Sequence, residues 1–113
     1  MKKNKKKFCF DLDGVICKTV KNYYFRSKPI QKNISKINKL YDEGNYILIF
    51  TSRFMGRSND NEKQAHKKGY KFTLNQLNSW GVKFHKLKLG KPSYDIFIDD
   101  KALFFKKNWS TKL

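Results

Sequence analysis

The chain has 113 residues, close to the commonest size of a single domain, and its hydrophobic content of 39% is enough for one core. Its 26 basic and nine acidic residues give a formal charge of +17, which predicts attraction to anions such as phosphorylated metabolites, nucleic acid or anionic lipid. The two cysteines lack the spacing of a disulfide framework or a zinc site, and no stretch approaches the ~20 apolar residues of a membrane span. We therefore expect a single cytoplasmic domain with no membrane segment.

The N-terminal segment is dominated by lysine. Five of the first seven residues are Lys, and the apolar run FCF follows at residues 8–10. We interpret residues 1–7 as a basic arm and residues 8–113 as the domain. The run at 8–10 is continuously apolar, which is typical of a parallel strand covered on both faces.

A helix and a second strand are predicted next. Pro29 and apolar residues at helical spacing predict a helix over residues 29–43, which Gly44 ends. The sequence YILIF at residues 46–50 then predicts a buried strand that ends at Thr51.

The remaining elements are less regular. A helical region with an apolar stripe runs to Trp80, and Gly69 is a candidate break within it. Residues 82–86 and 95–98 predict a third and a fourth strand. The alternation of strands and helices predicts an α/β fold with a small parallel sheet flanked by helices.

Polar residues gather where the predicted strands end. Asp11, Thr51 and Asp99 each terminate a different strand. A second aspartate accompanies each of the two acidic residues: Asp13 follows Asp11, and Asp100 follows Asp99. In open parallel sheets, ligands bind beyond the carboxyl ends of the strands. Clustered carboxylates repel one another unless a cation compensates them, so the pattern predicts a metal-dependent active site.

Four short segments resemble, in the same order, the motifs of the haloacid dehalogenase (HAD) superfamily of phosphohydrolases. They are residues 10–16 (FDLDGVI), 49–53 (IFTSR), 90–92 (GKP) and 98–101 (IDDK), and the match spans residues 8–101. A DxDG segment alone is moderately specific, but the order and strand context make the set strong. More narrowly, the chain is similar to small phosphatases of capsule and surface-polysaccharide biosynthesis. The resemblance implies a Rossmann-like HAD fold, and the short gaps between motifs imply that it has no cap domain.

The resemblance also implies a reaction. The chain would be a Mg²⁺-dependent phosphomonoester hydrolase in which Asp11 attacks phosphorus and forms an aspartyl phosphate. Asp13 would protonate the leaving oxygen and then activate water. Asp11, Asp99 and the backbone carbonyl of Asp13 would bind Mg²⁺, with Asp100 as a further ligand.

Residues that bind the phosphoryl group follow from the same resemblance. Thr51 would hold a phosphoryl oxygen, although Ser52 is an alternative for this contact. Lys91 would balance the phosphoryl charge and orient the nucleophile, and the neighbouring Lys86 and Lys88 are alternatives for that function.

Two of the three arginines of the chain follow the second motif. A guanidinium group binds phosphate bidentately, as Lys cannot, so Arg53 and Arg57 are candidate substrate-binding residues. The alternative for both is a structural function in the loop.

Several functions remain open from the sequence. The leading hypothesis is hydrolysis of a sugar phosphate or a related metabolite of polysaccharide biosynthesis. A polynucleotide end phosphatase is a less favoured alternative that the charge supports. A phospho-acceptor or binding domain without enzyme activity is another. An open site without a cap also predicts that another subunit shapes it, so we expect a homo-oligomer.

Overall fold

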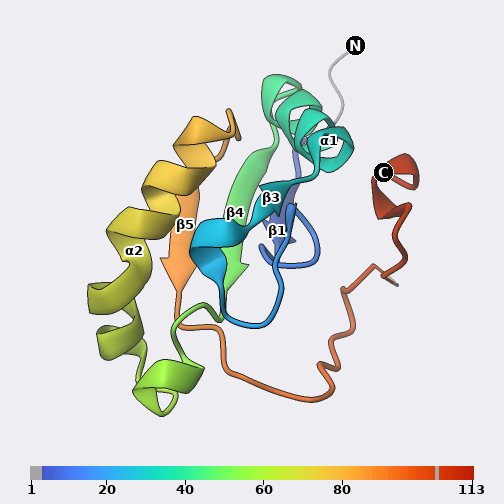
Figure 1. The fold of residues 1–113 in the computed structure, drawn as a ribbon. Helices are drawn as coiled ribbons and strands as arrows, with labels where there is room; N and C mark the ends of the chain where they lie inside the picture. Colours follow the sequence, from blue (N-terminus) through green and yellow to red (C-terminus); the bar gives the residue numbers. More distant parts are fainter. Residues whose placement is uncertain (1–3, 104) are drawn as a thin grey trace.

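The computed structural model describes residues 4–103 and 105–113 and shows a small α/β fold (Figure 1). Its two α-helices are α1 (Gln31–Asp42) and α2 (Glu62–Ser79), and its strands are β1 (Lys7–Phe10), β2 (Cys17–Lys18), β3 (Lys28–Pro29), β4 (Tyr46–Thr51) and β5 (Lys86–Leu89). Three short 3-10 turns complete it: η1 (Tyr24–Arg26), η2 (Gly56–Ser58) and η3 (Trp109–Thr111). Among the described residues, no helix combines the length and apolar character that crossing a membrane requires.

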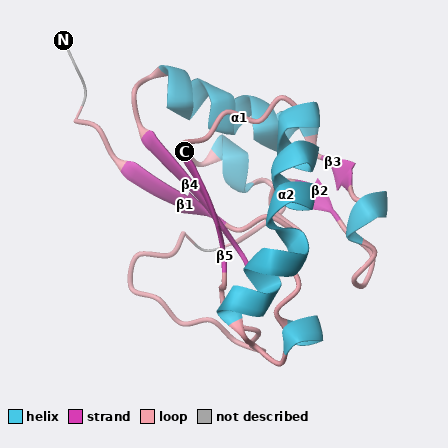
Figure 2. Ribbon diagram, turned by 90° about the vertical axis from the view of Figure 1, so that its left-hand side faces the viewer, coloured by secondary structure: helices cyan, strands magenta, loops and turns pink. Residues whose placement is uncertain are grey.

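The main sheet is parallel and has three strands in the order β1-β4-β5, while β2 and β3 form a separate antiparallel pair. The helix α1 connects β1 to β4, and α2 connects β4 to β5. The two connections step across the sheet in the same direction, and right-handed crossovers of that kind place both helices on one face. Figure 2 shows α1 and α2 on the same side of the strands. The parallel α/β sheet predicted from the sequence is therefore confirmed, but helices cover only one of its faces.

The core lies between that face and the helices. Apolar side chains at helical spacing on α1 and Leu77 of α2 pack against every second residue of the strands. Burying this surface is the main favourable term in folding, at roughly 25 cal/mol per Å². The strand and α1 residues of this buried cluster are Phe10, Ile47, Ile49, Leu87, Leu89, Ile34, Ile37 and Leu40.

The first helix and the third strand begin later than the sequence pattern predicts. The helix α1 begins at Gln31 because Pro29 pairs with Cys17 in the β2–β3 ladder. The strand β5 covers 86–89, not 82–86. Residues 82–85 (VKFH) and 86–89 (KLKL) both alternate apolar and polar side chains, so the sequence pattern does not distinguish between the two positions.

The predicted fourth strand is wrong. Residues 95–98 form no strand, and Ile96 and Ile98 are 80% and 91% exposed. A parallel strand needs a connection of a dozen or more residues, and only a short link separates β5 from this segment. The chain instead runs from β5 past the carboxyl ends of the strands to η3 as an irregular segment (Figure 1).

The last residues of the predicted basic arm are part of the folded domain. Residues 1–3 of the arm lie outside the described residues. Lys7 belongs to β1, the backbone N–H of Lys6 donates to Asn45 Oδ1 at 3.0 Å, and the Lys5 ammonium donates to the Glu43 carbonyl. At least this part of the arm is therefore anchored to the loop between α1 and β4.

Gly69 does not break the second helix, because α2 continues through it. A Cβ atom at this position would overlap the ring of Phe54, which packs directly on the helix backbone. Phe54 itself has a positive φ of 67°, a conformation that costs a bulky residue free energy and persists only where its surroundings impose it. Gly69 thus allows Phe54 to pack closely on the helix and does not end the helix.

We expect Gly69→Ala to lower the free energy of unfolding by about 1–3 kcal/mol, because overpacking outweighs the roughly 1 kcal/mol by which Ala is the better helix former. Urea denaturation measures the change. Gly56→Ala is the matched control, since a Cβ there meets no atom within 4 Å. Equal effects of the two substitutions would contradict the packing explanation.

Candidate active site at the carboxyl ends of the strands

The structure brings Asp11, Thr51 and Lys91 together. Asp11 follows the last residue of β1, Thr51 is the last residue of β4, and Lys91 lies two residues after β5. The Lys91 ammonium is 3.5 Å from Asp11 Oδ2, and the Lys91 backbone N–H donates to the Thr51 carbonyl at 3.2 Å. Three neighbouring parallel strands therefore deliver these residues to one edge. The sequence predicted this convergence for Asp11, Thr51 and Asp99, whereas Lys91 was expected from the HAD resemblance alone.

The Asp11–Lys91 pair is sheltered from solvent on the lysine side. The side chain of Lys91 is 10% exposed and that of Asp11 is 34% exposed. Burial raises the pKa of Asp11, although Lys91 and a hydrogen bond from the Leu12 backbone N–H partly oppose the shift. Burial also disfavours the charged form of Lys91, but the Tyr94 hydroxyl and Asp11 outweigh it and raise the pKa of Lys91. The surroundings thus favour the charged form of Lys91 and disfavour the charged form of Asp11.

Thr51 and Ser52 lie where β4 turns into the following loop. Thr51 is buried, and its hydroxyl oxygen accepts the backbone N–H of Arg53 at 3.1 Å. Ser52 is half-buried, and its carbonyl accepts the backbone N–H of Met55. Both residues therefore shape the turn beside Asp11.

Asp13 forms a bidentate ion pair with Arg53. Arg53 Nε donates to Asp13 Oδ2 at 2.9 Å, and Arg53 Nη2 donates to Oδ1 at 2.8 Å. The Thr19 hydroxyl also donates to Asp13 Oδ1. Arg53 therefore holds Asp13 in one orientation, while the Asp13 side chain stays 27% exposed and keeps lone pairs on Oδ2 that could take up a proton.

Arg53 is buried, at 1% exposure, and contacts several parts of the chain. Its Nη1 donates to Gln76 Oε1 of α2 at 2.6 Å, and Gln76 Nε2 donates to the Tyr24 carbonyl at 2.8 Å. The guanidinium carbon also lies 4.8 Å from the centre of the Tyr24 ring. Arg53 therefore joins the segment after β1 to α2, and its contacts correspond to the structural alternative and not to the predicted contact with substrate.

Arg57, the other candidate for substrate binding, is exposed. Its guanidinium donates to the Asn22 carbonyl, and its guanidinium carbon lies 5.1 Å from the ring centres of both Tyr24 and Phe54. These contacts leave part of the guanidinium facing solvent. Substrate binding by Arg57 stays a prediction.

Cys17 lies next to the Asp13–Arg53 pair but is not a candidate nucleophile. Its side chain is buried, and burial raises the pKa of its thiol to about 11. The thiolate is the reactive form of cysteine, and it is scarce at neutral pH when the pKa is so high.

Asp99 and Asp100 are not assembled with the other carboxylates. Both are exposed in the irregular segment after β5. Within residues 4–103 and 105–113, no three Asp, Glu, His or Cys side chains form a group that could hold a metal ion. The donor set as described does not fit a complete Mg²⁺ site.

Sequence reasoning missed the residues that support Asp13 and Lys91. The sequence indicates Gln76 only as part of a capping pattern, and it gives no signal for Thr19, Ser27 or Tyr94. The Ser27 hydroxyl accepts Arg53 Nη2 at 3.2 Å, and Tyr94 contacts Lys91. Such partners come from loops whose paths the sequence pattern does not determine.

Comparisons with known proteins support the fold. The structure is similar to the crystal structure of a structural genomics target from Vibrio cholerae, with a TM-score of 0.85 and 22% sequence identity over 96% of this chain and 89% of that chain. No protein-family model matches the sequence. No curated protein matches it either.

Proposed function

We propose that the chain hydrolyses phosphate monoesters with Asp11 as the nucleophile. The observation that carries the proposal is the convergence of Asp11, Thr51 and Lys91 from three parallel strands, with the Lys91 ammonium 3.5 Å from the Asp11 carboxylate. A carboxylate at a sheet edge next to a buried cation suits attack on an anionic phosphorus centre, because the cation offsets the charge that both reactants carry.

In the proposed reaction, an Asp11 oxygen attacks phosphorus, the bond from phosphorus to the ester oxygen breaks, and the leaving oxygen takes up a proton from the Asp13 carboxyl group. Asp13 takes a proton back from the water of the second step. Water then attacks phosphorus of the aspartyl phosphate, which releases inorganic phosphate and restores the carboxylate. Lys91 holds a phosphoryl oxygen in both steps. The resemblance to HAD phosphatases of polysaccharide biosynthesis makes a sugar phosphate the first substrate class to test.

Mg²⁺ remains the expected cofactor of this proposal by resemblance alone. The carboxylates do not form a complete site in the described arrangement, so we derive no step from the metal. Activity should therefore be measured both with added Mg²⁺ and with a chelator.

The test is a phosphate-release screen over sugar phosphates, nucleotides and oligonucleotide ends. We expect Lys91→Gln to lower kcat by about 100-fold or more, the usual cost of losing one donor to the reacting phosphoryl group. Lys88→Gln is the control, because Lys88 lies over the Phe50 ring and not beside Asp11. Phosphate release that Lys91→Gln leaves unchanged, or no release from any ester, would reject the proposal.

A further inference from the structure

In the part of the chain that the structure describes, no helix lies on the face of the main sheet that is turned away from α1 and α2 (Figure 2). Parallel sheets are almost always covered on both faces, so an open face in such a sheet is unusual. The half-buried Leu48 and Phe50 lie at its centre, on β4. We call this surface the open face; its residues are Lys7, Cys9, Tyr46, Leu48, Phe50, Lys86 and Lys88.

The open face is basic and aromatic. None of the nine acidic residues of the chain lies in β1, β4 or β5. The Lys7 ammonium lies 5.2 Å from the centre of the Tyr46 ring, and the Lys88 ammonium lies 5.6 Å from that of Phe50. Each aromatic ring on this face is thus accompanied by a cation.

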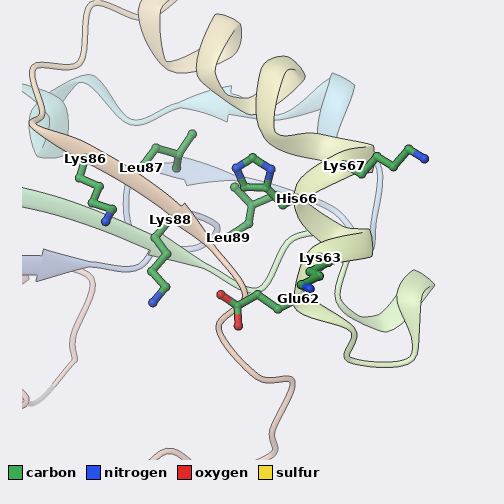
Figure 3. Close-up of a pocket in the computed structure, with 8 residues that line it drawn as sticks. All are labelled: Glu62, Lys63, His66, Lys67, Lys86, Leu87, Lys88 and Leu89. Atoms are coloured by element: carbon green, nitrogen blue, oxygen red, sulfur yellow. The ribbon is translucent and has the colours of Figure 1, made fainter.

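The basic surface continues around the edge of β5. Figure 3 shows Lys86 and Lys88 directed away from α2, whereas Leu87 and Leu89 point toward it. A groove of about 680 Å³ between β5 and α2 begins at these lysines and also carries Lys63, Lys67 and His66, with Glu62 as its one acidic side chain.

The open face also reaches the candidate active site. On the open face, Cys9 lies two residues before Asp11 and Lys88 lies three residues before Lys91. Beyond it, the Lys91 ammonium lies 5.0 Å from the centre of the exposed Phe97 ring. Cations and aromatic rings therefore alternate from β1 and β4 to Asp11.

The charge of the open face selects its occupant. A second copy of the chain would bring the same three lysines and a net charge of +17 against it, which opposes association through this face. An acidic protein would match the lysines, but a single strand supplies a planar base with every negative charge, which suits a face where each ring is accompanied by a cation. A single-stranded nucleic acid offers both phosphates for the lysines and planar bases for Phe50 and for the face of the Tyr46 ring that does not stack on His85.

We propose that the open face binds single-stranded nucleic acid, with its lysines on the phosphates and its rings under the bases. This inference goes beyond the proposed hydrolysis and does not require it, because binding is measured with an oligonucleotide that has no terminal phosphate. Failure of one proposal therefore leaves the other standing.

Fluorescence anisotropy with a labelled single strand of about 12 nucleotides tests the phosphate contacts. We expect the double variant Lys86→Gln/Lys88→Gln to weaken binding about 10-fold or more and to reduce the salt slope by roughly 1.4, or about 0.7 for each phosphate that no longer meets a lysine. Lys32→Gln/Lys39→Gln removes the same charge from exposed positions of α1 and should change affinity less than about 2-fold. Equal weakening in both double variants would mean that only net charge matters, and would overturn the proposal.

Two further measurements test the rings and the location. Tyr46→Leu should weaken binding roughly 5- to 100-fold, the range for loss of one base stack, whereas Tyr23→Leu, at another exposed tyrosine, should not. In the unmodified protein, the oligonucleotide should slow alkylation of the exposed Cys9. Full affinity in Tyr46→Leu, displacement of the oligonucleotide by polyglutamate at equal charge concentration, or no protection of Cys9 would each overturn the assignment.

Discussion

Replacing Asp11 with Asn is expected to reduce phosphate release by about 10³-fold or more without lowering the free energy of unfolding at neutral pH. Asparagine keeps the shape of the side chain but cannot attack phosphorus. It also removes a charge that the fold holds unfavourably, since burial raises the pKa of Asp11. Loss of activity with retained or increased stability identifies a functional residue that the fold does not need.

The pH dependence gives the sign of this stability effect. A raised folded-state pKa means that the folded protein binds the Asp11 proton more tightly than the unfolded chain does. The contribution of Asp11 to stability is therefore fully present below the unfolded pKa and is lost as the pH rises through the folded pKa. We expect Asp11→Asn to be more stable than the unmodified protein at neutral pH and to lose that advantage in acid.

Urea denaturation at several pH values, together with phosphate release, measures both effects. Asp42→Asn is the control, because Asp42 is exposed and pairs only with Lys83 at the surface. A marked loss of stability in Asp11→Asn at neutral pH would show that the ion pair with Lys91 has a structural function, and would weaken the case for Asp11 as the nucleophile.

The largest expected stability effect is at Arg53. Arg53→Ala should lower the free energy of unfolding by about 3–5 kcal/mol, the usual cost of removing one partner of a buried ion pair. Asp13 would lose its bidentate partner, Gln76 would lose an N–H donor, and the Tyr24 ring would lose the guanidinium beneath it. Total domain stabilities are about 5–15 kcal/mol, so this single change could unfold much of the population.

Arg53→Lys keeps the charge and tests the geometry. A lysine cannot reproduce the bidentate pair, so we expect an intermediate loss of stability together with lower kcat, because Asp13 is no longer held in place. Arg57→Lys is the matched control on the same loop, where the side chain is exposed and little stability should be lost. A higher KM with unchanged stability in Arg53→Lys would instead indicate that Arg53 binds the substrate.

A double-mutant cycle separates the pair from its surroundings. Combining Asp13→Asn with Arg53→Met should cost less than the sum of the single changes, by about 0.5–3 kcal/mol, because the partner left behind is no longer charged. Additive effects measured by urea denaturation would mean that Arg53 stabilises the loop mainly through Gln76 and Tyr24.

The sequence predicted the parts of the fold that depend on local periodicity. The helix α1 and the strand β4 have strong apolar patterns, and both formed within two residues of the expected bounds. The strand β5 was misplaced because residues 82–85 alternate apolar and polar side chains just as its own residues do. Residues 95–98 have the apolar character of a buried strand, but Ile96 and Ile98 are exposed in the structure.

The candidate site was also predictable only in part. Asp11 and Thr51 follow directly from strand ends, which parallel topology brings together, whereas Lys91 was expected from the HAD resemblance. Asp99, the third predicted strand end, lies in a segment that forms no strand. The ion pair of Asp13 with Arg53 was not predictable, because these residues are 40 positions apart and meet through two irregular loops. Whether Asp99 approaches Asp11 depends on a segment with no regular structure, and no sequence pattern fixes its path.

The strand order has a consequence for handling the protein. Both β1 and β5 are outer strands of the sheet, and each has a row of backbone groups free to pair with another chain. Lysines on outer strands discourage such pairing, and Lys7, Lys86 and Lys88 occupy these positions. Neutralising them should make concentrated samples prone to edge-to-edge aggregation, so light scattering should accompany every binding measurement on the lysine variants.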